Sequence, residues 1–368
     1  MKTPIMQFGT SRFLQAHADL FISEAMEKGE ALGPITVVQT TGSSERAERL
    51  KGLAVEGGFP VRIRGIEDGH PVDRLQQVTS VRRALSASAD WPEIERIFVE
   101  EVSLVLCNTA DQGYDISGEP RTLPADLPVS FPGKLTVLLH SRFAAGGAGL
   151  TILPCELISR NGQALRAIVA GLAAKWYAED EFRVWLGSDV FFCNTLVDRI
   201  VSEPLSPAGA VAEPYALWAI QRIAGQVLPC IHRDIVVADD IDPYEKLKLF
   251  ILNLGHSFLA DRWIAQGRAE SMTVREMLGD RQTRSDLLSL YETEIIPGFA
   301  QRSMAAEARA YVSKTLQRFD NPFLDHKLSD IAQNHAEKIH RRFQGFVDWS
   351  GATAPTLRAI IHSSDAGR

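Results

Sequence analysis

The segment Pro4-Ile-Met-Gln-Phe-Gly-Thr-Ser-Arg-Phe-Leu-Gln-Ala-His17 predicts how the chain begins to fold. Its apolar start favours a short buried strand, Gly9 permits a tight turn, and the amphipathic residues 18–26 that follow are typical of a helix. A strand, a turn and a helix in this order open a dinucleotide-binding unit, in which N–H groups at the start of the helix face a pyrophosphate. The motif G-x-G-x-x-G is incomplete, because Ser11 and Leu14 replace the second and third glycines.

Apolar strands alternate with helices through the first two thirds of the chain. Strands are expected at 35–39, 60–65, 104–108, 149–154 and 236–242, and helices at 91–99, 131–140 and 163–176. This alternation predicts a mostly parallel sheet in a Rossmann-like α/β domain. The carboxyl ends of such strands line a ligand crevice. The cofactor-binding candidates on this ground are Gly9, Ser11, Gln39, Thr40, Asn108 and Thr109.

The end of the strand at 35–39 leaves the choice between NAD and NADP open. An NAD enzyme often places Asp or Glu there to bind the ribose 2′-hydroxyl. Here the strand runs into Gln39-Thr-Thr41, with no carboxylate before Glu45. Ser43, Ser44 and Arg46 could accommodate a 2′-phosphate, and an ordinary polar loop is equally compatible with these residues.

A second stretch, Lys248-Leu-Phe-Ile-Leu-Asn253-Leu-Gly-His256, carries three polar side chains inside an apolar segment that we expect to be a buried α-helix. At about 100° per residue, Asn253 lies roughly 140° around the axis from Lys248, with His256 between them at about 80°. Each residue alone would most often be solvated or satisfied in a core. Together they predict an acid/base and oxyanion site, in which burial lowers the pKa of the lysine.

Strand patterns disappear after residue 243. Helices are expected at 272–278, 285–295, 305–317 and 327–343. We therefore predict two domains, a dinucleotide-binding domain at 1–240 and an all-helical domain at 241–368. Near the end of the first, Asn194 and Asp198 are four residues apart and would share one face if residues 191–201 form a helix.

Composition narrows the class of protein. The 368 residues carry a formal net charge of −7, which argues against a nucleic-acid-binding surface, since that usually needs a basic patch. The four cysteines occur singly, which disfavours a metal cluster and a disulfide framework. The start of the chain lacks the apolar core of a secretory signal, and no apolar window is long enough to cross a bilayer. A cytoplasmic protein that binds no membrane is expected, as a monomer or a dimer.

Three blocks of this sequence resemble the mannitol dehydrogenase family, the long-chain, metal-independent polyol and sugar-acid dehydrogenases. The first is the spacing Lys-x4-Asn-x2-His at 248–256. The second is the opening segment, in which Gly9, Phe13 and His17 match and which adds Phe13 to the expected cofactor-binding residues. The third is Asn194-Thr-Leu-Val-Asp-Arg-Ile200.

The resemblance assigns a role to each polar residue of these blocks. It implies that Lys248 is the general acid/base and that His256 contacts the substrate. Asn253 and Asn194 would donate hydrogen bonds to the developing alkoxide, and no metal ion would take part. The implied cofactor is NAD or NADP, with NAD favoured.

Further blocks look closer to the hexuronate branch of the family, among them Pro154-Cys-Glu-Leu-Ile158 and Arg318-Phe-Asp-Asn-Pro322. In the polyol enzymes an arginine and then a basic residue follow the second block, and here those positions hold Asp330 and Lys338. The missing arginine argues against a polyol pocket. Lys338 remains, with His326 and the neighbouring Lys327 as further partners for a substrate carboxylate.

The sequence therefore predicts an NAD(P)-dependent oxidoreductase that interconverts a keto-uronate and its aldonate, of the tagaturonate and altronate kind. A polyol 2-dehydrogenase of the mannitol or arabinitol type is the first alternative. A catalytically silent dinucleotide-binding or sensor protein on the same fold is the second.

Overall fold

The computed structural model describes the chain except residues 41–43, 68, 110–112 and 367–368, and it does not describe the side chains of 44–48 and 365–366. The chain divides into two compact units. Unit 1 comprises residues 1–63 and 73–241, and unit 2 comprises residues 64–72 and 242–368. Each unit is described by itself.

Unit 1 is built on a six-stranded sheet in which every described strand pairing is parallel. The strand order is β5 (Val81–Ser86), β2 (Ile35–Gln39), β1 (Ile5–Phe8), β6 (Leu104–Cys107), β7 (Thr151–Pro154) and β8 (Phe191–Phe192). Counted along the chain within this sheet, the order is 3-2-1-4-5-6, which is that of a doubly wound dinucleotide-binding fold. The predicted Rossmann-like fold class is confirmed.

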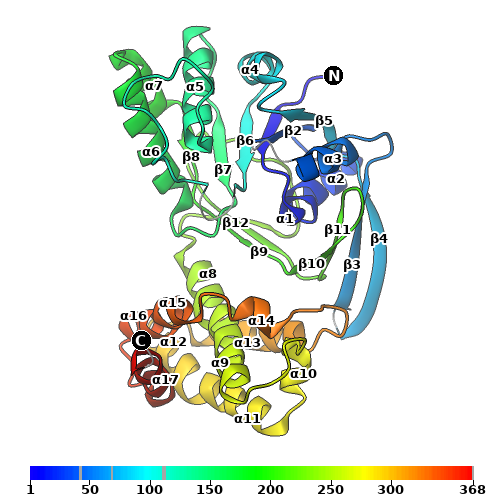
Figure 1. Ribbon diagram of the computed structural model, residues 1–368, viewed down its shortest axis with the longest axis vertical. Coiled ribbons are helices and arrows are strands. Elements are labelled where there is room, and N and C mark those ends of the chain that lie inside the picture. The colour runs from blue at the N-terminus through cyan, green and yellow to red at the C-terminus, as the bar shows by residue number, and fades with distance from the viewer. Residues whose placement is uncertain (41–43, 68, 110–112, 367–368) are drawn as a thin grey trace. The chain divides into compact units, whose positions relative to one another are not determined.

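Helices cover both faces of this sheet because its strands are apolar on both sides. Along β6, Leu104 and Leu106 join one buried cluster, whereas Val105 and Cys107 join the other. Helices α5, α6 and α7 lie together on the second of these faces (Figure 1). The helices of unit 1 are α1 (Arg12–Gln15), α2 (Ala18–Lys28), α3 (Ser44–Leu53), α4 (Trp91–Glu100), α5 (Phe131–Ala144), α6 (Asn161–Trp176) and α7 (Asp180–Ser188).

Two smaller sheets lie mainly in unit 1, and the turn-side ends of β3 and β4 fall within residues 64–72 of unit 2. One has the order β10 (Val201–Pro204), β11 (Ala210–Ala212), β3 (Phe59–Glu67) and β4 (His70–Val78). The other has the order β13 (Ile235–Ala238), β12 (Leu217–Gln221) and β9 (Thr195–Asp198). Residues 191–201 therefore do not form the helix in which Asn194 and Asp198 would share a face, because Thr195 and Val197 lie in a strand that pairs antiparallel with β12. Thr and Val are residues that strands favour, and the partner strand decides between the two readings.

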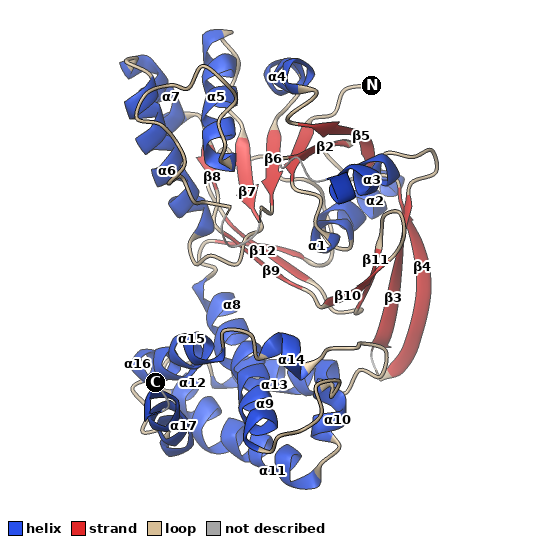
Figure 2. Cartoon of the chain, viewed as in Figure 1, coloured by secondary structure: helices blue, strands red, loops and turns tan. Residues whose placement is uncertain are grey.

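Beyond the ends of β3 and β4 that fall within residues 64–72, the described residues of unit 2 form helices and loops, with a single bridge between Thr273 and Lys327 (Figure 2). Three of its segments are π-helical, η1 (Lys248–Asn253), η2 (Tyr291–Ile295) and η3 (His340–Gln344). Its α-helices are α8 (Asp242–Leu247), α9 (Leu254–Ala265), α10 (Val274–Leu278), α11 (Arg281–Leu290), α12 (Ile296–Ala300), α13 (Ala305–Phe319), α14 (Leu328–Ile331), α15 (His335–Ile339), α16 (Gly345–Ser350) and α17 (Pro355–Ala366).

One buried cluster of aromatic and aliphatic side chains holds these helices together, with Phe258, Tyr291, Phe299 and Phe346 among its largest members. The prediction of one continuous helix at 327–343 is wrong. Asn334 adopts φ 54°, in the left-handed region, and separates α14 from α15. No helix in the described part of the chain is long and apolar enough to cross a membrane.

Candidate active site

The loops after β1 and β6 meet at the point where the strand order reverses. The amide N of Gly9 donates to Val38 O at 3.0 Å, and the amide N of Asn108 donates to Phe8 O at 3.0 Å. Gly9 has φ 118°, and a Cβ there would collide with the carbonyl oxygen of Asn108. Only glycine fits this position without strain. In open α/β sheets this switch point is where ligands bind.

The residues predicted from the sequence for the cofactor gather at this carboxyl edge. Gln39 ends β2 and Thr40 follows it, just as Asn108 and Thr109 follow β6. Ser11 accepts a hydrogen bond from Leu14 N and thereby caps α1. The binding of a cofactor by these residues stays a prediction. Ser43 and the side chains of Ser44 and Arg46, the candidates for a 2′-phosphate, lie outside the described residues.

His17 is fully buried in unit 1, and Phe13 is half-buried against the same core cluster. The ring of Phe13 stacks on His17 with centroids 4.8 Å apart, and His17 also contacts Phe21 and Trp218. His17 Nε2 lies 3.1 Å from the carbonyl oxygen of Leu217. These contacts lie at the junction of α1 and α2, so both rings pack behind the loop that follows β1 and do not extend from it.

Glu156 is a residue of this edge that the sequence interpretation missed. Its buried carboxylate accepts from the amide N and from Oγ1 of Thr109, each at 3.1 Å, and from the hydroxyl of Tyr114 at 3.2 Å. Burial raises its pKa above the ordinary range for glutamate. Asn108 is tied to the same turn, because its Nδ2 donates to Cys155 O at 2.7 Å. The available signal was an acidic residue two positions after a buried strand.

Asn194 is held rigidly in unit 1. Its Oδ1 accepts from the amide N of Gln163 in the first turn of α6 at 3.0 Å, and its Nδ2 donates to Gln221 Oε1 at 2.7 Å. Gly162 permits this approach, because a Cβ there would collide with the backbone at Cys193 and Asn194. The side chain is 5% exposed, so its orientation is fixed by the protein.

The segment that carries Lys248 is helical as predicted, but its turn from Lys248 to Asn253 is π-helical. Residues Lys248–Asn253 form η1 between α8 and α9, and the amide N of Leu254 donates to Leu249 O, five residues earlier. The expected angles of an ideal α-helix are therefore wrong between Lys248 and Asn253, since a π turn takes more residues than an α turn. Single π turns inside α-helices are frequent at functional sites.

His256 is the most buried of the three predicted residues of this helix. It is 6% exposed, whereas Lys248 and Asn253 are half-buried. Its ring lies against Phe319 at 4.6 Å and against His326 at 4.7 Å, measured between centroids. Among the residues that the structure describes, its Nε2 has no hydrogen-bond partner.

Burial and positive neighbours keep both histidines neutral. Burial, followed by the charges of His326, Arg342, Arg318 and Lys248, lowers the pKa of His256 well below its ordinary value. Burial and the charge of Arg318 lower the pKa of His326 to about 4. The structure thus brings together Lys248, His256 and the predicted substrate residue His326. Arg318, 7% exposed, and Arg342 are cations here that the sequence interpretation did not assign.

Lys338 and Asp330 stand at the positions that differ from the polyol enzymes. The Nζ of Lys338 donates to Ile331 O at 2.9 Å, at the end of α14, and the side chain is half-buried. Asp330 is exposed. Its negative charge raises the pKa of His326 and so opposes burial and the charge of Arg318, which lower that pKa. The acidic side chain therefore points toward solvent.

The fold and the site together define a class. A doubly wound sheet with a glycine-lined switch point in unit 1, and a lysine, an amide and a neutral imidazole on one helix of unit 2, are the parts of a dinucleotide-dependent dehydrogenase. The chain belongs to the mannitol dehydrogenase family. The model of that family's Rossmann domain matches residues 3–228, and the model of its C-terminal domain matches residues 240–353.

Individual relatives agree with this assignment. The altronate oxidoreductase of Halalkalibacterium halodurans is 31% identical over 97% of this chain and 74% of its own length. That of Klebsiella pneumoniae is 33% identical over 92% of this chain and 73% of its own length.

Two solved structures share the fold. A substrate-free D-sorbitol dehydrogenase has a TM-score of 0.80, at 20% identity over 94% of this chain and 76% of its own. The mannitol 2-dehydrogenase of Pseudomonas fluorescens, in a complex with NAD and D-mannitol, has a TM-score of 0.75, at 20% identity over 99% of this chain and 79% of its own.

Proposed function

We propose that this protein is an NAD-dependent oxidoreductase that interconverts a keto-uronate and its aldonate, with tagaturonate and altronate as the substrate pair. The observation that carries the proposal is the similarity to altronate oxidoreductases, at 30–33% identity over more than nine tenths of the chain. The chain retains the lysine, asparagine and histidine of the family on one helix of unit 2.

The carboxyl edge of unit 1 fits a dinucleotide. Gly9 presents no side chain where β1 meets β6, which lets a pyrophosphate approach the backbone. Glu156 holds the backbone of Thr109 in the segment that follows β6. A bound nicotinamide would supply or accept the hydride. The loop after β2 would receive the adenosine ribose, at Gln39 and Thr40.

In unit 2, Lys248 would move the proton that accompanies hydride transfer. In the direction of reduction its ammonium group donates a proton to the oxygen of the new alcohol, and in the direction of oxidation the neutral amine removes one. Asn253 would donate an amide N–H to the developing alkoxide without adding a charge that opposes protonation of Lys248. The neutral His256 would orient a substrate hydroxyl through its Nε2. The role of Asn194 as a second amide donor stays a prediction from the resemblance.

The charges around His256 favour a substrate with a carboxylate. Arg318 and Lys248 both act on this imidazole, and His326 lies against it. Cationic donors such as Arg318 and Lys248 make stronger hydrogen bonds to a carboxylate than to a neutral hydroxyl, which favours a uronate over a polyol. We propose that Arg318 and His326, with Lys338, form the side of the site that receives the carboxylate.

Absorbance of the reduced nicotinamide tests the reaction directly. NADH and NADPH are each mixed with tagaturonate, fructuronate and fructose. Oxidation of NADH by a keto-uronate alone is the expected result. Turnover with fructose alone would instead place the protein among polyol dehydrogenases, and NADH binding without turnover of any substrate would favour the silent sensor.

A pair of variants in one helix tests the lysine. Lys248→Ala should lower kcat by about a factor of 10² to 10⁴, the usual contribution of general acid/base catalysis, with NADH affinity unchanged. Lys246→Ala is the matched control, because Lys246 lies on α8 with its Nζ 5.7 Å from the Phe250 ring and carries no proposed role. Near-normal turnover by Lys248→Ala would refute the assignment.

A further inference from the structure

The π-helical turn that carries Lys248 and Asn253 packs against the other two π-helical segments of unit 2. In η2 the amide N of Ile296 donates to Tyr291 O, and in η3 the amide N of Gly345 donates to His340 O, both across five residues. Each of these segments sends one side chain to a backbone carbonyl of η1. A π-helix is rare and occurs mostly as a single turn, so its persistence calls for tertiary contacts.

Tyr291 of η2 supplies the first contact. Its hydroxyl donates to Ile251 O at 3.0 Å, and both residues are fully buried. The approach depends on Gly255, because a Cβ at that position would collide with the Tyr291 hydroxyl. The carbonyl of Ile251 also accepts from Leu254 N, three residues ahead. Without the tyrosine hydroxyl, the turn would lose a buried hydrogen bond that an ordinary α-helix in this place would not need.

Arg342 of η3 supplies the second contact. Its Nη1 donates to Asn253 O at 2.9 Å and to the hydroxyl of Ser257 at 2.8 Å. The guanidinium thus bridges the last residue of η1 and the first turn of α9. Burial lowers the pKa of Arg342 to about 10, which still leaves it charged at neutral pH. A charged donor makes the stronger kind of hydrogen bond to a carbonyl.

We propose that Tyr291 and Arg342 are positioning residues that hold the turn Lys248–Asn253 in its π-helical form and so aim the Lys248 amine and the Asn253 amide. This inference rests on the proposed function, because Tyr291 and Arg342 would act on the same site. Converting the π turn to an α turn would shift the register between Lys248 and His256 by one residue, which is about 100° around the helix axis. A lysine aimed correctly in one form is therefore misdirected in the other.

Variants of Tyr291 provide the first test. Tyr291→Phe removes only the hydroxyl and should lower kcat at least about tenfold, the effect of a small misplacement in an active site, with KM for NADH within twofold. Glu294→Gln is the matched control from the same π segment. The buried Glu294 accepts from Thr356 N and Leu357 N, and none of its hydrogen bonds to the residues that the structure describes reaches η1. It should lower the Tm while kcat stays near that of the wild type.

Variants of Arg342 provide the second test. Arg342→Met should lower kcat as Tyr291→Phe does, and Arg342→Lys should recover part of the loss because it keeps one charged donor. The pH at which kcat is half-maximal should also move in Tyr291→Phe, since the surroundings of the Lys248 amine change, and stay in Glu294→Gln.

A readout independent of turnover separates this inference from the proposed function. The rate at which an amine-selective acylating reagent modifies Lys248, followed by mass spectrometry of the peptide, should change at least about threefold in Tyr291→Phe and Arg342→Met, and not in Glu294→Gln. Wild-type protein inactive on every sugar tested would overturn the proposed function while this labelling still decides the inference. Unchanged labelling together with unchanged kcat in both variants, with only the Tm lowered, would overturn the positioning role.

Discussion

Replacing His326 with asparagine should make unit 2 less sensitive to acid. Burial and the charge of Arg318 lower the pKa of this imidazole from 6.5 to about 4. The unfolded chain therefore takes up a proton near pH 6.5 that the folded protein does not. Stability from this group is complete above pH 6.5 and is lost as the pH falls toward 4.

The two pKa values set the magnitude. Between pH 7 and pH 5 the difference in proton binding amounts to about 2 kcal/mol of unfolding free energy. His326 is partly exposed, so solvent screening reduces the expected loss to about 1 kcal/mol. His326→Asn should remove this part of the pH dependence, whatever its effect on stability at pH 7.

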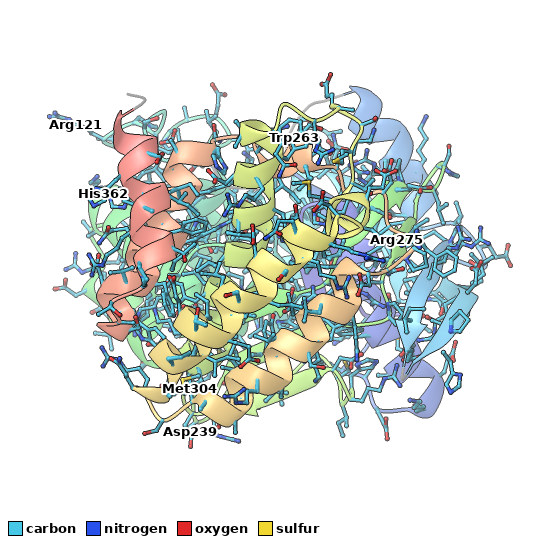
Figure 3. All side chains as sticks on the ribbon, turned by 90° about the horizontal axis from the view of Figure 1, so that it is seen from below. Arg121, Asp239, Trp263, Arg275, Met304 and His362 are labelled. Atoms are coloured by element: carbon cyan, nitrogen blue, oxygen red, sulfur yellow. The ribbon has the colours of Figure 1, made fainter. Side chains whose placement is uncertain are left out.

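Urea unfolding followed by helical circular dichroism at pH 7 and pH 5 measures the quantity directly. The difference between the two pH values is compared for the wild type, His326→Asn and His362→Asn. His362 is an exposed histidine on α17 in the same unit (Figure 3), so its replacement controls for the loss of a surface ring. A wild-type pH dependence that persists unchanged in His326→Asn would refute the assignment of a depressed pKa to this group.

Two predictions concern the edge of the sheet in unit 1. Gly9→Ala should destabilise the fold by at least about 2 kcal/mol and weaken NADH binding, because its Cβ meets Asn108 O at a positive φ. Gly29→Ala is the control, because Gly29 has φ 73° with open space around it, and it should cost less stability and leave NADH binding unchanged. Thermal melts and nucleotide titration of both variants measure the two effects. Glu156→Gln should gain stability relative to the wild type as the pH rises from 5 to 8, because the raised pKa of the buried carboxyl makes its ionisation unfavourable; urea unfolding that shows a constant difference would contradict this.

The local patterns of the sequence were sufficient for the fold class and for the helix on which the predicted site residues lie. The strand, turn and helix around Gly9 appear where they were predicted, because apolar runs and a glycine turn signal act within a few residues. The same is true of the helix that carries Lys248 and His256, whose apolar length marks it as buried. Resemblance to the mannitol dehydrogenase family came from short spacings of this kind, and the family is confirmed.

The errors have a common physical origin in partners that are distant in sequence. Residues 195–198 are a strand because β12 pairs with them, although their own spacing also fits a helix. The two cations near His256 that the sequence interpretation did not assign, Arg342 and Arg318, come from η3 and α13, so no spacing near Lys248 could reveal them.

By itself, the sequence determined that a doubly wound sheet is followed by helices and that one helix carries a lysine, an asparagine and a histidine. Only the tertiary structure decided how those three groups are directed. The π turn between Lys248 and Asn253 depends on donors 40 and 89 residues further along the chain, from Tyr291 and Arg342. Folding brings each of these donors to a backbone carbonyl of the turn from a distant part of the sequence.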